Sequence, residues 1–424
     1  MSDLLPHVLL AIPVVVLACQ AGGRAVRLLG QPPVIGEILA GILLGPSLLS
    51  WLAPSVQHHL FPPSVLPITS ALGNLGLLTF LFLMGLELNL RSLSITRGAI
   101  AAVSLSGVLL PMALGAALAS ALYPHFAPPG VGQLPFTLFV AVALSITAFP
   151  VLARILADRG LKNTPLGAFA LACAAIDDAL AWCLLTTAVA LSTSGTVLSG
   201  LTTLALTAAF ATGLILLRPV LHALLKRAGR TSDDIVGVLL FAGLCLSAYA
   251  TDQIGVHPAF GAFLFGVAAP RALPAVERSA ARIHAVVLPL LLPLFFADIG
   301  LHTDFSTLPA GQWGWGAAIL AVAVIGKWGG AAGAARLTGS DWRWSAALGT
   351  LMNCRGLTEL VVLGIGLQIG VISKTLFTLL VVMTVITTVA TTPILRRVAG
   401  HDPRMTPPAP HDGPERAAAR EITR

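Results

Sequence analysis

Two adjacent carboxylates, Asp177 and Asp178, interrupt a long apolar run of this sequence, Ala174-Ala-Ile-Asp-Asp-Ala-Leu-Ala-Trp182. An ionisable group inside such a run is costly and rare, so it suggests function by default. Successive helical residues point about 100° apart, so the two side chains should face different surroundings. Burial and mutual repulsion favour the neutral form of at least one of them. That carboxylate would then hold either a proton or a cation, and this competition would couple the movements of the two.

A lysine in a second apolar run, Val324-Ile-Gly-Lys-Trp-Gly-Gly330, is the predicted partner of this pair. Lys327 lies within about 5 Å of the centre of its run, by the rise per residue of a helix. A lysine near a helix end would instead extend to the membrane surface. We therefore expect Lys327 to form an ion pair with Asp177 that is released when a cation binds.

Two further runs are interrupted by residues that disfavour a continuous helix. In run 134–157, Ser145 and Thr147 precede Pro150, which leaves the carbonyl of Ile146 without its usual helical donor. Run 343–371 is polar and glycine-rich at its centre, with Asn353, Arg355, Gly356, Thr358, Glu359, Gly364, Gly366 and Gly370. Broken helices of this kind expose carbonyls and half-helix dipoles to an ion in the middle of a membrane. We expect Ser145 and Thr147 to join the two aspartates in a cation and proton site, in one layer with Lys327 and Arg355.

The elements that must position these residues are membrane-spanning helices. Of the 424 residues, 56% are hydrophobic and only 10% are charged, whereas soluble domains carry roughly 25% charged residues. A span needs roughly 20 apolar residues, and about thirteen such runs occur: 4–20, 33–50, 67–87, 98–122, 134–157, 164–191, 196–218, 234–251, 256–270, 284–300, 312–335, 343–371 and 374–397. The predicted fold is an all-α polytopic membrane protein. The fifth and twelfth runs are seven apart, which suits inverted repeats of six helices joined by a seventh.

The distribution of the 25 Lys and Arg residues predicts the orientation of these spans. Cytoplasmic connections hold the excess of basic residues. The odd-numbered connections hold Arg24, Arg27, Arg91, Arg97, Arg154, Arg159, Lys162, Arg218, Lys226, Arg227, Arg230, Arg271, Arg278, Arg282, Arg336 and Arg343. The even-numbered connections hold Lys374 alone, and six more arginines follow the last span. The N-terminus is therefore predicted outside and the C-terminus in the cytoplasm, and the net charge of +7 needs no nucleic-acid partner.

Residues 1–398 are predicted to form one transmembrane domain, and the proline-rich segment 399–424 a disordered cytoplasmic tail. The five cysteines lie inside apolar runs and lack metal-ligand spacing, so they are interpreted as small core residues. No cofactor is expected. Glu37, Glu87 and Asp298, near the ends of spans, are candidate gate or capping residues.

Four stretches of the chain resemble the monovalent cation:proton antiporter-2 family over roughly residues 30 to 397. They are Gly36-Glu-Ile-Leu-Ala-Gly-Ile-Leu-Leu-Gly-Pro46, Ser145-Ile-Thr-Ala-Phe-Pro-Val-Leu-Ala-Arg-Ile-Leu156, Phe295-Phe-Ala-Asp-Ile-Gly-Leu301 and Asn353-Cys-Arg-Gly-Leu-Thr-Glu-Leu-Val361. The second and fourth read most like the plant cation/proton exchanger branch. That branch commonly has Asn-Asp where this chain has Asp177-Asp178, so its potassium preference and electroneutrality do not transfer directly.

The resemblance implies the sodium/proton antiporter fold: a homodimer with interleaved dimerisation and core subdomains, the core built around two crossed discontinuous helices. By position, it makes Asp178 the cation carboxylate, Asp177 its partner, and Lys327 the lysine that pairs with that partner in electrogenic antiporters. Arg355 and Glu359 match a charged pair in the second broken helix.

The resulting hypothesis is an electrogenic, elevator-type exchange of Na+ or K+ for H+ across a bacterial inner membrane, without enzymatic activity. Two alternatives stay open. A sodium-coupled symporter of organic anions on a related fold would need basic or polar groups for the anion, and the predicted core offers few apart from Arg355. A channel or a non-transporting receptor would have no need for an acid pair.

Overall fold

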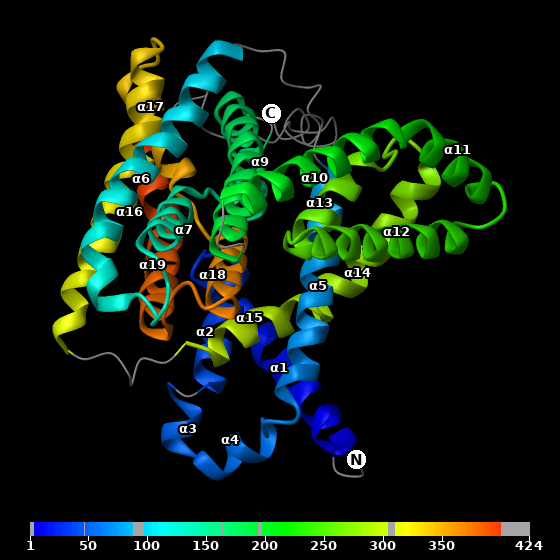
Figure 1. Ribbon diagram of the computed structural model, residues 1–424, viewed down its shortest axis with the longest axis horizontal. Helices are drawn as coiled ribbons and strands as arrows, with labels where there is room; N and C mark the ends of the chain where they lie inside the picture. The colour runs from blue at the N-terminus through cyan, green and yellow to red at the C-terminus, as the bar shows by residue number, and fades with distance from the viewer. Residues whose placement is uncertain are drawn as a thin grey trace, which may run out of the picture.

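The computed structural model describes residues 4–45, 47–87, 97–162, 164–193, 197–303 and 310–399, and these ranges fold as helices without a strand (Figure 1). Within them, nine helices are long and apolar enough to cross a membrane, and the bent pair α10 and α11 adds a tenth. Three shorter apolar helices, α7, α13 and α18, occupy the other predicted runs. The predicted all-helical polytopic membrane fold is therefore confirmed, whereas the predicted tail lies outside the described residues from 400 onward.

One group of helices, here called the flanking bundle, contains none of the buried charges singled out above. Its helices are α1 (Leu4–Leu28), α2 (Pro33–Leu44), α3 (Leu49–Leu52), α4 (Pro54–Leu60), α5 (Leu66–Glu87), α11 (Arg218–Gly229), α12 (Asp233–Ile254), α13 (Pro258–Ala268), α14 (Pro274–Leu290) and α15 (Leu292–Leu301). α10 (Val197–Leu216) connects this group to the rest of the chain. The helices α10 to α14 form one side of the molecule in Figure 1, and α1 to α4 its lower part.

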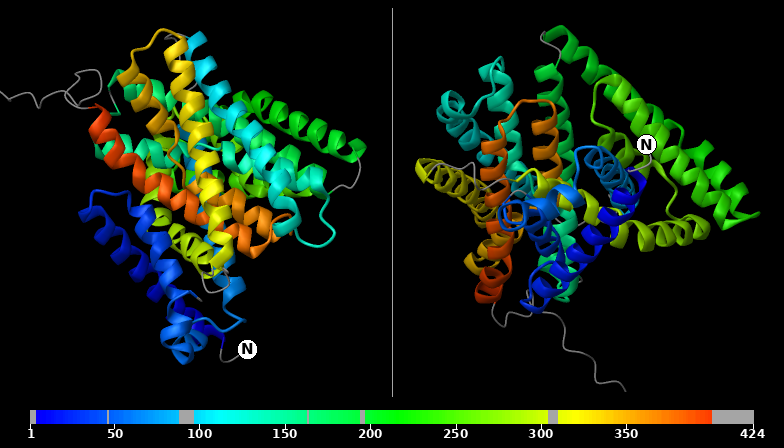
Figure 2. Two further views of the ribbon diagram at one scale, coloured as in Figure 1. Left: turned by 90° about the vertical axis from the view of Figure 1, so that its left-hand side faces the viewer. Right: turned by 90° about the horizontal axis from the view of Figure 1, so that it is seen from below.

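The second group, here called the crossover bundle, holds the predicted site. It consists of α6 (Arg97–Phe126), α7 (Gln133–Ser145), α8 (Phe149–Asp158), α9 (Pro165–Thr193), α16 (Trp313–Leu337), α17 (Trp342–Met352), α18 (Leu357–Gln368) and α19 (Lys374–Ala399), with the short η2 (Ala310–Gln312) before α16. α6 packs against α16 and α7, and α9 packs against α6, α7 and α17. Figure 2 shows α16 and α19 running beside these helices, so residues far apart in sequence meet in one bundle.

The two interrupted runs become broken helices in the structure. α7 stops at Ser145, Ile146 and Ala148 have extended backbones, and α8 begins at Phe149 with Pro150 in its first turn. α17 and α18 are likewise separated by residues 353–356. Breaks in a membrane span are tolerated where protein neighbours satisfy the freed backbone groups, and here each break lies in the middle of the crossover bundle.

Close contact between α1 and α2 explains one glycine of the motif that begins at Gly36. A β-carbon on Gly36 would lie 2.1 Å from the carbonyl oxygen of Gly22, so the two backbones could not approach as they do. Small residues allow this approach in membranes. That motif residue therefore positions helices in the flanking bundle.

The helix limits differ from the prediction on the face of the molecule that holds the odd-numbered connections, here called the basic face. α14 begins at Pro274, not near 284, so Arg278 and Arg282 are helical. They pair with Asp233 and Asp234 at the start of α12, at 2.7 Å in each case. A purely apolar scan missed this part of α14 because its helix is amphipathic there. α10 likewise continues after a 47° bend into α11, which carries Arg218, Lys226 and Arg227.

Large apolar side chains remain exposed along the outer helices, as expected for contact with lipid tails. They include Leu9 and Leu17 on α1, Leu109 on α6 and Leu246 on α12. The multi-pass membrane assignment therefore agrees with the surface of the structure as well as with helix length.

Candidate cation and proton site

The two broken helices meet at their breaks. The amide of Ala148 donates to the carbonyl of Cys354 at 3.1 Å, and the Thr147 hydroxyl lies 3.0 Å from the carbonyl oxygen of Met352. These contacts satisfy backbone groups that a continuous helix would have paired internally. They also connect the two extended segments, so the crossing is held by direct hydrogen bonds.

Two cationic side chains cap the C-terminal end of α7. The guanidinium of Arg355 donates to the carbonyls of Leu144 at 2.6 Å and Ala143 at 3.3 Å. The ammonium of Lys327 donates to the carbonyl of Ser145 at 2.6 Å. The last carbonyls of a helix lack intrahelical partners and form the negative end of its dipole, so both cations are stabilised there.

Asp177 lies directly against this cap. Its Oδ2 accepts from the Lys327 ammonium at 2.8 Å, and both side chains are fully buried. The Thr147 hydroxyl is 3.1 Å from the same oxygen. Oδ1 of Asp177 is buried without a hydrogen-bond partner among the described residues. The structure thus brings Asp177, Lys327 and Thr147 together, in the arrangement expected from the sequence.

Asp178 faces different surroundings from its neighbour. Its side chain lies near that of Thr358 on α18. The Asp178 Oδ1 and the Thr358 hydroxyl are both buried, and neither has a hydrogen-bond partner within the described part of the chain. Asn353 Oδ1, at the end of α17, is a further buried acceptor without a partner there. Buried polar groups usually find partners, so these oxygens are suited to a transported ion.

Arg355 also forms an ion pair with Glu359, one helical turn along the same segment. The distance between them is 2.9 Å, and both side chains are fully buried. The carbonyl of Arg355 accepts from Thr388 of α19 at 2.6 Å. Because Arg355 is also bonded to α7 and α19, the pair fixes the break between α17 and α18 to both of these helices.

The residue after Arg355 must be glycine for two reasons. Gly356 has φ = 153° and ψ = −119°, in the region that favours glycine. A β-carbon there would lie 2.7 Å from Cγ2 of Val151 on α8. The glycine therefore allows the second broken helix to turn while packed against the first.

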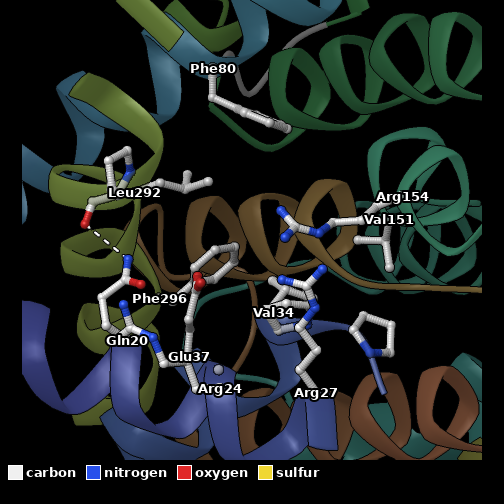
Figure 3. Close-up of a pocket in the computed structure, with 14 residues that line it drawn as sticks. Gln20, Arg24, Arg27, Val34, Glu37, Phe80, Val151, Arg154, Leu292 and Phe296 are labelled. Atoms are coloured by element: carbon white, nitrogen blue, oxygen red, sulfur yellow. Dashed lines mark hydrogen bonds between the residues drawn. The ribbon is translucent and has the colours of Figure 1, made fainter. Parts of the chain in front are cut away.

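A cavity of about 350 Å³ approaches this crossing from the basic face (Figure 3). It lies between the two bundles, with Gln20, Arg24, Arg27 and Glu37 on one side and Val151 and Arg154 of α8 on the other. Val151 is the side chain that packs on Gly356. The cavity is therefore lined by a side chain of α8 that contacts the break between α17 and α18.

Ser145 reaches the site through its backbone, not through its hydroxyl. The Ser145 hydroxyl donates to Val142 within its own helix at 2.8 Å, so Ser145 faces Lys327 with its carbonyl. Thr358 and Asn353 are polar residues of a broken run that the sequence did not predict as site residues. Their position beside the glycine break was the available signal. Across the described ranges, no group of three or more His, Cys, Asp or Glu could hold a metal ion.

Comparison with known proteins places the chain among ion exchangers. The family model described as "Sodium/hydrogen exchanger, transmembrane" matches residues 14–398. The chain is 39% identical over 373 residues to a protein named Na(+)/H(+) antiporter NhaS4 from Synechocystis, covering 87% of this chain and 91% of that protein. It is 38% identical over 396 residues to Cation/H(+) antiporter 19 from Arabidopsis thaliana. That match covers 92% of this chain but 49% of the plant protein, so the chain spans about half the length of this relative.

A solved structure shares the fold. The sodium proton antiporter MjNhaP1 from Methanocaldococcus jannaschii superimposes with a TM-score of 0.70 at 14% identity, over 95% of this chain and 98% of that one. At this identity the likeness concerns the fold alone, and it confirms the sodium/proton antiporter fold that the motifs implied. The match to the family model over residues 14–398 and the 39% identity to the Synechocystis protein show that the chain belongs to the sodium/hydrogen exchanger family of membrane transporters.

Proposed function

We propose that this protein is a secondary active antiporter that exchanges a monovalent cation, Na+ or K+, for protons. The observation that carries the proposal is the buried acid pair, Asp177 and Asp178. Each has one buried oxygen without a partner among the described residues, and only Asp177 forms an ion pair with Lys327. Family membership and the names of the relatives support the same reaction. Burying two carboxylates in a membrane span is too costly to be retained for packing alone.

Asp178 is the proposed cation ligand. Its Oδ1, the Thr358 hydroxyl and the amide oxygen of Asn353 are buried acceptors without partners in the part of the chain that the structure describes. Hard monovalent cations are bound by oxygen atoms that replace their hydration shell. These groups come from α9 and from both sides of the second break, so movement of either helix would change the ion's surroundings.

Asp177 is the proposed proton-coupling group. When it is ionised, its Oδ2 accepts from Lys327 and Thr147. When it carries a proton, it can donate to the Thr147 oxygen while Thr147 donates to the carbonyl of Met352. Lys327 would then be held only by the carbonyl of Ser145 and the dipole of α7. Proton binding at Asp177 would therefore break the ion pair and change the packing at the crossing.

Two titratable carboxylates and one monovalent cation favour two protons per cation. Each cycle would then move one net charge across the membrane, worth about 2.3 kcal/mol per 100 mV. Transport would be electrogenic and would depend on the membrane potential. Asp178 would bind either the cation or one proton, and the adjacent Asp177 would bind the second proton, so the two substrates share one site.

The proposed movement is an elevator-type displacement of the crossover bundle against the flanking bundle. The broken helices, both aspartates, Lys327 and Arg355 belong to the crossover bundle, so the whole site would move together. The cavity between the bundles opens toward the basic face, which would make this an inward-facing conformation if the N-terminus lies outside. We further propose a homodimer in a bacterial inner membrane, held through the flanking bundle.

Dissipation of a preset pH gradient in proteoliposomes tests the proposal. Addition of Na+, K+ or Li+ should release the gradient with the wild-type protein and not with Asp178→Asn. A wild-type protein that responds to none of these cations would contradict antiport. Gradient release that requires an organic anion would indicate symport, and cation conduction without proton movement would indicate a channel.

A further inference from the structure

A second cavity, of about 250 Å³, adjoins the cavity between the bundles. Arg27 and Pro32 line both cavities, at the turn between α1 and α2. The larger cavity is within the range of roughly 300–1,000 Å³ that is usual for small-molecule sites. The two cavities therefore adjoin at this turn, and residues of α1, α8 and α19 contribute to their walls.

Positive charge dominates this space. Among the described residues that line the first cavity, Arg24, Arg27 and Arg154 accompany a single carboxylate, Glu37. Figure 3 shows Arg27 and Arg154 extending toward each other from opposite walls. Among the described residues that line the second cavity are Arg27, Arg159 and Arg396, and none is acidic. The positive-inside rule explains the side of the membrane on which these arginines lie, but not their convergence on one cavity.

Two of these arginines approach the same glycine. Arg159 Nη2 donates to the carbonyl of Gly30 at 3.1 Å. A β-carbon on Gly30 would lie 3.3 Å from Arg396 Nη2 and 3.7 Å from Arg159 Nη2. The two guanidinium groups therefore lie close together at the second cavity, which Gly30 also lines.

We propose that the two joined cavities bind a phosphate-bearing anion. Guanidinium groups match phosphate oxygens with paired hydrogen bonds, and a phosphate monoester carries about −1.5 to −2 charges at neutral pH. A multivalent anion suits a space whose described lining residues include five arginines and one carboxylate. The phosphate monoester can belong to a soluble ester or to the headgroup of phosphatidic acid, since both present three terminal oxygens.

Such an anion would connect the two bundles. Arg24 and Arg27 belong to α1 of the flanking bundle, whereas Arg154 and Arg159 belong to α8 and Arg396 to α19 of the crossover bundle. Bound phosphate would hold the bundles in the arrangement seen here and slow transport. This regulatory consequence rests on the proposed elevator movement, but anion binding itself does not.

Thermal unfolding of the full-length protein in phosphatidylcholine nanodiscs tests the site. One arm adds glycerol 3-phosphate, and the other replaces part of the lipid with phosphatidic acid. A ligand that binds only the folded state raises Tm. At least one arm should raise the Tm of the wild-type protein, and the arm that responds identifies the source of the phosphate.

Three variants sharpen the test. Arg27→Gln combined with Arg154→Gln should raise the apparent Kd at least about tenfold. Arg343→Gln, which removes an exposed arginine of the basic face outside both cavities, should leave the Kd unchanged. Glu37→Gln should lower the Kd, because it removes the single carboxylate of the first cavity.

The proposal is overturned if neither arm stabilises the wild-type protein, or if the double variant binds as tightly as Arg343→Gln. Transport in proteoliposomes then tests the regulatory consequence separately. The responding phosphate should slow cation-driven proton release by the wild-type protein and not by the double variant. Binding without slower transport would keep the site and refute the connection between the bundles. An inactive wild-type protein that still binds phosphate would contradict the proposed function alone.

Discussion

Two fully buried ion pairs lie at the crossing, and they differ in what their cations can do. Arg355 and Glu359 belong to one segment, four residues apart, whereas Lys327 and Asp177 come from α16 and α9. A guanidinium stays protonated in proteins, and its fork also serves the carbonyls of Ala143 and Leu144. A buried lysine can lose its proton. This difference fits a structural role for the first pair and the proposed coupling role for the second.

The energetics of buried pairs support this division. Removing one partner of such a pair typically costs roughly 3–5 kcal/mol, because the other charge is left uncompensated. A pair that must open during transport cannot be bonded on all sides. Lys327 has Asp177 and one carbonyl, whereas Arg355 has Glu359, two carbonyls and a bond from Thr388 to its own backbone.

The largest expected effect follows from a change outside both pairs, Asp178→Asn. It removes the charged cation ligand while keeping the shape of the side chain, so exchange should fall about 100-fold, on the order of 3 kcal/mol. Proton release from proteoliposomes measures this. Asp234→Asn, a change at an exposed aspartate, is the control, and both variants should keep the wild-type Tm within a few degrees. Exchange within threefold of wild type would refute the role of Asp178.

Arg355→Met should destabilise the protein by roughly 3–5 kcal/mol, because Glu359 and two carbonyls of α7 lose their partner. Lys327→Met should cost less, since Asp177 retains Thr147 and only one carbonyl is freed. Equilibrium unfolding of the two detergent-solubilised variants compares the pairs directly. Equal losses of stability would contradict the division between a structural and a coupling pair.

Thr147→Val should reduce the exchange rate about tenfold, because a buried hydrogen bond to a charged group contributes roughly 1.5–3 kcal/mol. The hydroxyl serves Asp177 and the Met352 carbonyl. Thr147→Ser, which keeps the hydroxyl, is the matched control and should recover most of the activity. If the serine variant is as slow as the valine variant, the hydroxyl has no part in coupling.

Ser145→Ala should have the smallest effect, with exchange within about twofold of wild type and a stability change of about 1 kcal/mol or less. The Ser145 hydroxyl is bonded within α7, and its carbonyl, which the substitution keeps, is the group that meets Lys327. Initial rates at saturating cation measure this. A loss comparable to that of Thr147→Val would show that the hydroxyl reaches the ion in another conformation.

Much of the fold was predictable because membrane spans obey few rules. The lengths of the apolar runs and the positions of Lys and Arg indicated the helices, and Pro150 and Gly356 indicated the two breaks. The amphipathic part of α14 was missed because its arginines pair with Asp233 and Asp234 of another helix. A scan for apolar residues cannot detect such partners.

The sequence predicted the ion pair between Asp177 and Lys327, but not the contacts that these segments make with backbone carbonyls. Depth in a span singled out Asp177, Asp178 and Lys327. The capping of α7 brings together residues that are far apart in the sequence. Lys327 and Ser145 are separated by 182 positions, and Arg355 and Leu144 by 211. Backbone carbonyls carry no sequence signal, so these roles emerged only from the structure.

The voltage dependence of Asp177→Asn tests the central account most directly. Cation-driven proton flux is measured in proteoliposomes at potentials set by a thiocyanate gradient, with the wild-type protein as reference. With two protons per cation, net flux stops at a certain ratio of cation concentrations across the membrane. For the wild-type protein this ratio should change about 50-fold for each 100 mV of membrane potential. Asp177→Asn, with one titratable carboxylate left at the site, should show no shift. An equal shift in both proteins would contradict the proposed coupling role of Asp177.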